Sequence, residues 1–313
     1  MTRNAADPRL SVVVALISGK KGDLERCLQA LSSQRGAPDF EILVPWDDAA
    51  REVAELASHF PNARFLHANG LDTRAARAGA SREHHDTLRT LGLRAARGSI
   101  VALTEDHAVA TPTWCADMMA ALDAHPRAAA VGGAVECGAT SLLGRAVYYC
   151  DFGRYENPLP EGPAQYVSDS NVAYRRSALE AIADAWADDY HETVVHGALV
   201  ACGFDIVLTR KSEVAQVRTG LSFGEALRER FVWGRSYAGT RVAGAPLTQR
   251  AVFAAMTVLL PFLLTWRLLR GKLARKRDLG RFLACLPLVF LLQVGWALGE
   301  LIGYATGDPG KVR

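Results

Sequence analysis

The chain has 313 residues, of which 50% are hydrophobic and 22% are charged, with a formal net charge of +3. This composition supplies enough apolar surface for a folded core and excludes a chain that is mainly disordered. The small positive charge is spread along most of the chain, so it does not indicate nucleic-acid binding. The six cysteines contain no C-x-x-C pair, and we interpret them as thiols in a reducing compartment.

The first hundred residues alternate between predicted strands and helices. Leu10–Ile17 is a continuous apolar run, typical of a strand buried on both faces, and the leucines that follow predict a helix over Asp23–Gln34. Further strands are predicted at residues 40–45, 63–67 and 99–104, with helices at 49–59 and 86–96. Such alternation indicates a parallel sheet, in which ligands bind at the carboxyl ends of the strands.

From about Trp114 the pattern becomes mixed. It contains helices, short strands and a long segment at 144–167 with Gly, Pro and Tyr. Helices are predicted at 177–187 and 192–202, followed by a strand at 204–209. We expect this half to supply the rest of a ligand-binding cleft.

The tail contains two apolar segments joined by a basic linker. Ala251–Trp266 carries no charge and is interrupted by Pro261, whereas Phe282–Glu300 has eighteen uncharged residues before its one acid. Only the second segment reaches the length of a membrane-spanning helix. Two buried core helices are the alternative, but the basic linker and the tryptophans at 266 and 296 favour a bilayer. We therefore predict a membrane-associated helical hairpin at 246–305.

Acidic residues follow two of the predicted strands. Asp47 and Asp48 follow the strand at 40–45, and Glu105, Asp106 and His107 follow the strand at 99–104. Alternate side chains of an extended strand face one side, so Glu105 and His107 can face one divalent cation. A diphosphate leaving group needs such a cation, because no side chain alone neutralises its charge. A solvated turn or a helix cap is the alternative interpretation.

Several stretches, in their order and spacing, resemble the family 2 glycosyltransferases with the GT-A fold. They are SVVVALIS with LERCLQALSSQ, EILVPWDDA, LRTLGLRAARGSIVALTEDHAVATPTW, SDSNVAYRRSALE, HETVVHGALVACG and RERFVWGRSYAG. This resemblance covers about residues 10–240. It implies an α/β fold of GT-A type, with a Rossmann-like, mostly parallel central sheet. The catalytic domain would occupy 1–240, with a nucleotide-sugar-binding half at 10–110 and an acceptor half at 111–240.

The resemblance also implies residues that bind the donor. Asp47 would accept from the base of the nucleotide, with Asp48 in its place if the register differs by one. Ser18 would lie beside the nucleotide at the end of the first strand. Arg89 stands near the donor, although Thr90 replaces the asparagine that often follows this arginine in the family.

The two metal-binding places of the family's D-x-D motif fall on Glu105 and His107, so this sequence has E-x-H instead. Imidazole is a softer ligand than carboxylate and would favour Mn²⁺ over Mg²⁺. Asp106 is assigned to the donor side, and with Glu105 it could hold the metal if His107 does not. The pair His84-His85 shows no metal spacing, and we interpret it as part of a surface loop.

For catalysis the resemblance implies that Glu192 is the base that accepts the proton of the acceptor hydroxyl in an inverting transfer, with Asp189 as the substitute. A helix-terminal acid favoured by the macrodipole is the alternative for Glu192. The positions that resemble the acceptor side or clamp a phosphate are Asp169, Asn171, Arg230, Trp233 and Arg235. Their alternatives are a polar turn and a solvated amphipathic helix.

These features together predict a hexosyltransferase that uses a nucleotide sugar and a lipid-linked or glycan acceptor beside membrane lipids, without nucleic acid. The catalytic domain is expected in the cytoplasm at the inner or plasma membrane, because nucleotide sugars are cytosolic. The basic linker also favours the cytoplasm, so both expectations cannot hold if residues 251–266 fully cross. Either that segment is re-entrant or interfacial, which we favour, or the hairpin crosses twice.

Rival interpretations make different demands on the sequence. A nucleotidyltransferase on a similar fold predicts a Gly-rich phosphate loop with a lysine, of which Ser18–Gly22 is a faint echo. A dinucleotide oxidoreductase needs G-x-G-x-x-G after the first strand, and this is absent. A membrane scaffold whose transferase domain has decayed is the non-enzymatic alternative.

Overall fold

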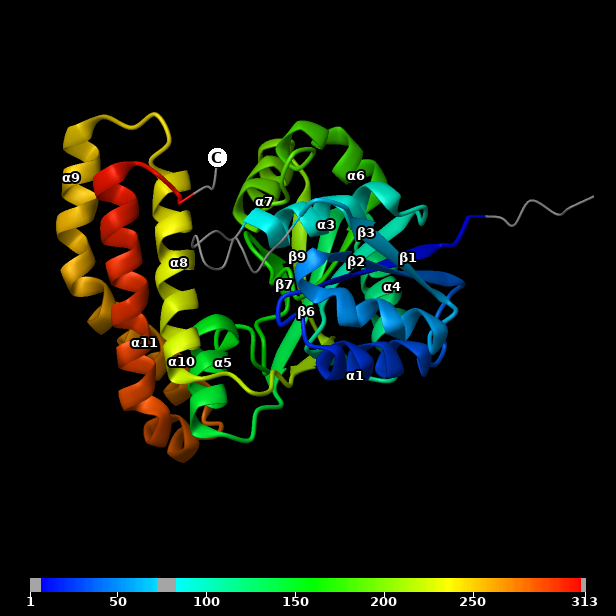
Figure 1. Ribbon diagram of the computed structural model, residues 1–313, viewed down its shortest axis with the longest axis horizontal. Helices are drawn as coiled ribbons and strands as arrows, with labels where there is room; N and C mark the ends of the chain where they lie inside the picture. The colour runs from blue at the N-terminus through cyan, green and yellow to red at the C-terminus, as the bar shows by residue number, and fades with distance from the viewer. Residues whose placement is uncertain (1–6, 72–82, 311–313) are drawn as a thin grey trace, which may run out of the picture. The chain divides into compact units, whose positions relative to one another are not determined.

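The computed structural model describes residues 7–71 and 83–310 and divides the chain into two compact units (Figure 1). Of the described residues, 7–71, 84–136 and 155–217 form unit 1, and 83, 137–154 and 218–310 form unit 2. The helix at 223–241, which we assigned to the catalytic domain from the sequence, belongs with the tail helices in unit 2. The segment 137–154 does so as well.

Unit 1 is built around a nine-stranded sheet in the order β3-β2-β1-β4-β8-β6-β9-β5, with β7 paired to β9. The first four strands in this order run parallel, and β8 is antiparallel to both β4 and β6. The structure therefore confirms the predicted α/β fold with a mostly parallel central sheet. The strands are β1 (Leu10–Ala15), β2 (Phe40–Asp47), β3 (Ala63–Ala68), β4 (Ile100–Glu105), β5 (Ala108–Ala110), β6 (Ala128–Cys137), β7 (Gly162–Ala164), β8 (Asn171–Arg175) and β9 (Asp205–Gln216).

Burial explains why the strands could be recognised in the sequence. Every residue of β1 is buried because this strand lies between β2 and β4, which gives it an uninterrupted apolar run. β9 is the exception, since it extends seven residues beyond the predicted strand. Its second half is largely polar, although buried and more exposed residues alternate along it, and β5 pairs with its end.

The helices of unit 1 mostly match the predicted positions. They are α1 (Lys21–Ser32), η1 (Asp48–Ser58), α3 (Glu83–Ala95), α4 (Trp114–Ala124), α6 (Arg176–Ala181), η2 (Ala183–Ala185) and α7 (Glu192–Ala201). η1, at the position of the helix predicted over 49–59, is a 3₁₀ helix with a kink at Ala50. The predicted helix at 177–187 divides into α6 and η2. Side chains from β1, β4, β8, α3 and α7 form the main core.

One buried carboxylate joins the strands at the amino-terminal edge of the sheet. Glu41 of β2 accepts hydrogen bonds from the Ser11 hydroxyl at 2.8 Å and from the backbone N–H of Arg97 at 2.9 Å. The guanidinium groups of Arg97 and Arg64 lie 3.0 and 2.8 Å from its other oxygen. Burial raises the pKa of Glu41, but these bonds outweigh burial and hold the pKa below its ordinary value.

Unit 2 is helical. Its elements are α5 (Leu142–Phe152), α8 (Phe223–Arg241), α9 (Leu247–Met256), η3 (Thr257–Leu259), α10 (Leu260–Arg275) and α11 (Leu279–Thr306). α9, η3 and α10 follow one another without a break, and Pro261 stands in the first turn of α10, where its missing N–H costs no helical bond. Both apolar stretches, Leu247–Arg275 and Leu279–Thr306, are long enough to span a membrane.

We expect Glu41→Gln to lower the free energy of unfolding by about 2 kcal/mol, because the charged hydrogen bonds to two arginines are lost. The contribution of Glu41 is present above the unfolded-state pKa and disappears as the pH falls through the lower folded-state pKa. Denaturant titrations at pH 7 and at pH 3 measure both effects. The exposed Glu52→Gln is the control, and equal stability losses in the two variants would contradict the role of Glu41.

Candidate functional site

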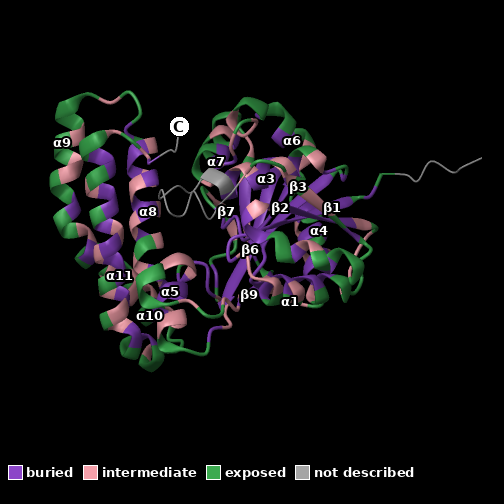
Figure 2. Cartoon of the chain, viewed as in Figure 1, coloured by how far each residue is buried: buried purple, intermediate pink, exposed green. Residues whose placement is uncertain are grey.

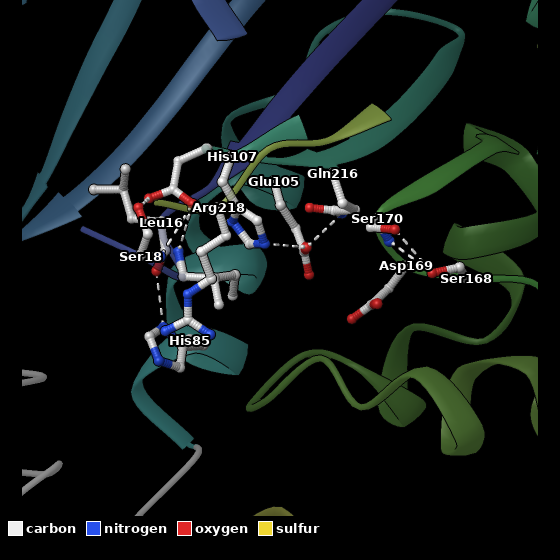
Figure 3. Close-up of polar contacts among 12 residues, drawn as sticks. Leu16, Ser18, His85, Glu105, His107, Ser168, Asp169, Ser170, Gln216 and Arg218 are labelled. Atoms are coloured by element: carbon white, nitrogen blue, oxygen red, sulfur yellow. Dashed lines mark hydrogen bonds and ion pairs between the residues drawn. The ribbon is translucent and has the colours of Figure 1, made fainter. Parts of the chain in front are cut away.

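Four buried polar side chains, those of Glu105, Asp106, His107 and Asp169, gather at the carboxyl end of β4. Figure 3 shows Glu105, His107 and Asp169. β4 ends at Glu105, and a tight turn through Asp106 and His107 leads to β5. All three side chains are at most 5% exposed, so their charges must be compensated inside the protein. Asp169, in the turn before β8, joins them because β8 pairs with β4.

Asp106 holds the loop that follows β1. Its two carboxylate oxygens accept from the backbone N–H groups of Ile17, Ser18 and Gly19, at 3.2, 3.1 and 2.8 Å. The Ser18 hydroxyl donates at 2.9 Å, and Nδ1 of His107 lies at 2.9 Å. Burial raises the pKa of Asp106, but the bonds from His107 and Ser18 outweigh it and lower the pKa to about 2. These contacts give Asp106 and Ser18 a structural part in shaping the loop.

His107 is oriented toward Glu105 by the same carboxylate. Because an ionised Asp106 can only accept, Nδ1 of His107 carries the proton in that bond. Nε2 then faces Oε2 of Glu105 at 3.5 Å. An imidazole that donates to a carboxylate through one nitrogen and presents the other is the usual arrangement of a metal-ligating histidine. The predicted pair Glu105 and His107 is therefore brought together.

Arg89 of α3 lies fully buried among three carboxylates. Its Nη2 lies 2.8 Å from Asp169 and 3.3 Å from Glu105, and its Nη1 lies 3.2 Å from Asp86. Burial lowers the pKa of this guanidinium, but the three acids outweigh burial and raise it. The place of Arg89 near the donor stays a prediction. In the structure its guanidinium holds Glu105 close to Asp169.

The described contacts of this cluster bring several acids onto few basic groups. Asp86, Glu105 and Asp169 lie within 3.3 Å of the Arg89 guanidinium, and Asp106 lies 2.9 Å from the His107 imidazole. Burial raises the pKa of Glu105, as expected for an acid with neighbouring acids and little solvent. In the described part of the chain, no three His, Cys, Asp or Glu side chains form a group that could hold a metal ion. The protein thus offers a pair of ligands, Glu105 and His107, within an acidic surrounding.

Two members of this cluster were not found from the sequence. Gln216, the last residue of β9, donates its side-chain N–H to Oε2 of Glu105 at 3.1 Å. Asp86 is a buried residue of α3 and follows His85, whose Nδ1 lies 2.8 Å from the Leu16 carbonyl oxygen. His85 is buried, so our interpretation of it as a surface-loop residue is wrong. No sequence signal marks Gln216, because its strand reaches the site only through antiparallel pairing far along the chain.

The two acids predicted to bind the base lie at the end of β2. Asp47 is buried and accepts from the N–H of Ala49 at 3.2 Å, where it caps η1. Asp48 lies 3.0 Å from Arg51 and 3.2 Å from His67. Burial raises the pKa of Asp48, but Arg51 and His67 outweigh burial and lower it. His67 also stacks on Trp46 at a centroid distance of 4.0 Å.

The expected acceptor-side residues have unequal surroundings. Asn171 is fully buried, and its amide bonds to the Trp114 indole at 2.7 Å and to the carbonyl oxygens of Ala134 and Ser212 at 2.7 and 3.2 Å. These contacts join β8, α4, β6 and β9, which indicates a structural role. Asp169, in contrast, belongs to the charged cluster through Arg89.

Glu192 and Asp189 lie at the start of α7. Glu192 is its first residue and half-buried, and Asp189 accepts from the Thr87 hydroxyl of α3 at 2.8 Å. Beneath them the Tyr174 hydroxyl contacts both the Tyr190 hydroxyl and Nε2 of His196 at 2.7 Å. Burial raises the pKa of Tyr174 well above its ordinary value, and the negative charges of Glu192 and Asp169 add to this.

Arg230, Trp233 and Arg235 belong to α8 in unit 2. Arg230 is buried, pairs with Asp151, bonds to Gln293 at 3.1 Å and lies 4.5 Å from the Trp296 ring. Arg235 pairs with Asp308 at 2.7 Å. These partners connect helices within unit 2, so the structure gives Arg230 and Arg235 packing roles there.

Comparisons with known proteins show what this chain is similar to. Residues 11–183 match the family model described as glycosyl transferase family 2. A mannosyltransferase from Pyrobaculum calidifontis, solved with GDP-Man and Mn²⁺, is similar in structure over 95% of this chain and 88% of its own, with a TM-score of 0.53 and 16% identity. Among curated proteins, none is similar enough in sequence to count as a relative.

A second solved structure is TarS 1-349 from S. aureus in complex with UDP-GlcNAc. It covers 72% of this chain and 65% of its own, with a TM-score of 0.44 and 12% identity. At these identities, similarity in structure shows the fold alone.

We expect Asp106→Asn to destabilise unit 1 by about 3 kcal/mol, because an amide nitrogen cannot accept from the Gly19 N–H and the Ser18 hydroxyl. The amides of residues 17–19 should exchange hydrogen faster in this variant, which hydrogen-exchange mass spectrometry on that loop measures. Asp123→Asn, at an exposed ion pair, is the control. Unchanged exchange in the loop would show that Asp106 does not hold it.

Proposed function

The chain belongs to glycosyl transferase family 2, and we propose that it transfers a sugar with inversion, aided by a divalent metal, from a nucleotide-diphosphate donor to a lipid-linked or membrane-proximal acceptor. The observation that carries this proposal is the pairing of Glu105 with His107 at the carboxyl end of β4. Ligands bind at this edge of a parallel sheet. A glycosyltransferase that uses such a donor must stabilise the negative charge of the diphosphate as it leaves, and we propose that this happens at this edge.

The donor set at β4 fits a divalent cation. Glu105 and Nε2 of His107 would hold it, because Asp106 already fixes the other nitrogen of the imidazole and Glu105 presents its carboxylate 3.5 Å from Nε2. When bound, such an ion would neutralise charge on the departing diphosphate. The relative from P. calidifontis holds Mn²⁺ beside GDP-Man, which agrees with the mixed carboxylate and imidazole pair.

For the donor nucleotide we propose the edge formed by β1 and β2. Asp106 holds the loop at residues 17–19 in one conformation, so the loop is already ordered before the donor arrives. Ser18 would lie beside the nucleotide and Asp47, or Asp48, would accept from its base. Arg89 would act indirectly, by keeping Glu105 in position, because its guanidinium is fully buried.

We assign the role of base to Glu192. A base must stay ionised and within reach of the acceptor hydroxyl, and Glu192 is half-buried at the start of α7. Asp189, whose carboxylate accepts from the Thr87 hydroxyl of α3, is the substitute. The buried Tyr174–Tyr190–His196 network would fix the position of α7 under the acceptor.

The acceptor is proposed to be lipid-linked because unit 2 provides apolar surface for a hydrocarbon chain. A groove of about 480 Å³ lies between α8 and α11, lined by Phe223, Leu227, Phe231, Leu291 and Leu298, with Arg228 at the same site. Its volume falls within the usual range of ligand sites. Because nucleotide sugars are cytosolic, we place the catalytic unit in the cytoplasm, at the inner or plasma membrane.

A screen of nucleotide sugars tests this function. One donor, with Mn²⁺, should raise the melting temperature by several degrees at saturating concentration and be hydrolysed slowly without acceptor. Thermal melting and release of the nucleoside diphosphate are the measurements. A chain that neither binds nor cleaves any nucleotide sugar would instead be the decayed scaffold.

We expect Glu105→Gln to lower kcat for donor hydrolysis by at least a hundredfold, because the amide keeps the shape of the side chain but not the charge that would hold the cation. The Mn²⁺-dependent part of the thermal stabilisation should vanish as well. Glu52→Gln, at an exposed position, is the control for both readouts. Turnover equal to that of the unaltered protein would remove Glu105 from this role.

We expect Glu192→Gln to reduce kcat for sugar transfer by about 10²- to 10⁴-fold, with donor binding retained, because only the proton acceptor is lost. Asp189→Asn is the matched variant and should reduce kcat far less. Transfer rates and donor affinity are measured for both. If Asp189→Asn caused the large fall in kcat and Glu192→Gln did not, Asp189 would be the base.

A further inference from the structure

The helices α8 and α11 of unit 2 pack so closely that their backbones are in contact, as two glycines of α11 show. A Cβ at Gly299 would lie 2.0 Å from the Phe231 carbonyl oxygen, and one at Gly303 would lie 2.5 Å from that of Arg235. Any larger side chain would separate the helices. The depth of α11 in a membrane therefore determines the depth of α8.

α8 is too charged to lie within a bilayer. It carries six charged side chains, namely Glu225, Arg228, Glu229, Arg230, Arg235 and Arg241. Arg230 and Arg235 have acidic partners within unit 2, but Glu225, Arg228 and Arg241 are exposed. Each charge at the centre of a bilayer would oppose insertion strongly. If α11 crossed the membrane, it would draw these charges into the hydrocarbon.

The amino-terminal half of α11 is covered by α5 instead. Phe282 packs on Tyr149 with ring centroids 5.1 Å apart, and the Cys285 thiol contacts the Leu142 carbonyl. In α11, 44% of its most apolar eighteen-residue stretch is buried, whereas only 11% of the corresponding stretch in Leu247–Arg275 is buried. Figure 2 shows the same contrast between α11 and the helices α9 and α10. The apolar surface available to lipid belongs mainly to α9 and α10.

The carboxyl end of α10, just before the linker to α11, is fixed to α5 and to the two residues that follow α5. Lys272 is buried with its ammonium 4.4 Å from the Tyr149 ring, and Arg275 donates at 2.8 Å to the carbonyl oxygens of Gly153 and Arg154. The segment 137–154 is joined to unit 1 by the chain at both ends, with no apolar span between. The linker must therefore stay on the side of the membrane that unit 1 occupies.

The exposed face of α9 and α10 has the composition of a surface that enters the membrane interface. Leu259, Phe262, Leu263 and Trp266 are each at least 49% exposed. Exposed basic residues flank this face, namely Arg267, Arg270, Lys276, Arg277 and Arg281. An apolar face beside a cationic rim matches the hydrocarbon and phosphate layers of one leaflet.

We infer that unit 2 is a monotopic anchor: α9 and α10 lie in the interface of one leaflet that contains anionic lipid, and neither apolar stretch crosses the bilayer. Length and composition alone would allow two spans. The charged α8 beside α11 and the fixed linker oppose this. The arrangement keeps the basic linker and unit 1 on one side, as both expectations from the sequence require. It does not depend on which sugar, or whether any sugar, is transferred.

Cysteine labelling tests the sidedness in membranes from cells that express the full chain. The native Cys202 is exposed on unit 1 and serves as the reference. In a Cys202→Ser background, Lys276→Cys marks the linker, and Ala243→Cys marks the connection between α8 and α9. Both positions are exposed, and Cys202→Ser alone gives the background labelling of the other thiols.

An impermeant maleimide should label both introduced cysteines in the preparation where it labels Cys202 and spare them in the preparation where it spares Cys202, when intact cells and inverted vesicles are compared. Labelling of one of them from the opposite side would overturn the inference, since a crossing hairpin separates the linker from the connection. Donor hydrolysis by the labelling variants reports folding separately. Failure of the proposed function would leave the labelling pattern unaffected.

Vesicle flotation tests the lipid itself. The purified chain should bind vesicles with anionic lipid more tightly than neutral ones, and Arg267→Gln with Arg270→Gln should weaken anionic binding about tenfold or more. Glu52→Gln is the control. A second copy of the chain is the competing occupant of the face, so a stable dimer that ignores vesicles would overturn the inference.

Discussion

The candidate site depends on one buried anion. Asp106 connects the loop after β1 to the turn after β4, and its negative charge is stabilised by backbone N–H groups, a hydroxyl and an imidazole. The same carboxylate fixes which nitrogen of His107 faces Glu105. Two features that seem separate in the sequence, an ordered loop and an oriented ligand, therefore have a single physical cause. Arg89 plays the corresponding part on the other side of Glu105, where it draws Asp169 and Asp86 inward.

Much of the fold could be predicted because buried parallel strands leave a strong signal. β1 and β4 are continuous apolar runs, and Glu105 comes at the point where such a run meets the sheet edge. The pairing of Glu105 with His107 followed from the two-residue period of an extended chain. The division of the chain was harder to predict. α8 carries a motif that resembles the catalytic family, yet it packs within unit 2 through glycines whose importance depends on a partner helix seventy residues away.

Residues reached by long-range pairing could not be assigned from the sequence. Gln216 contacts Glu105 only because β9 runs antiparallel past β5, and its neighbours along the chain, Ala215 and Val217, give no sign of a site. Asn171 illustrates the opposite error. Its motif suggests contact with a substrate, but its side-chain amide is hydrogen-bonded to the Trp114 indole and to two carbonyl groups inside the sheet. A polar residue in a motif can thus hold the framework while its neighbour Asp169 carries the charge.

The position of β8 has a consequence for how the protein is made. This strand is synthesised late, yet it lies between β4 and β6, two strands made before it. Until it arrives, both neighbours have an open edge and Arg89 lacks Asp169. Insertion of β8 joins β4 to β6 and brings Asp169 to Arg89 in one event. β9 is made later still, and it completes both the sheet and the contacts of Glu105, because Gln216 is its last residue. The apolar helices of unit 2 are synthesised after every strand of the sheet.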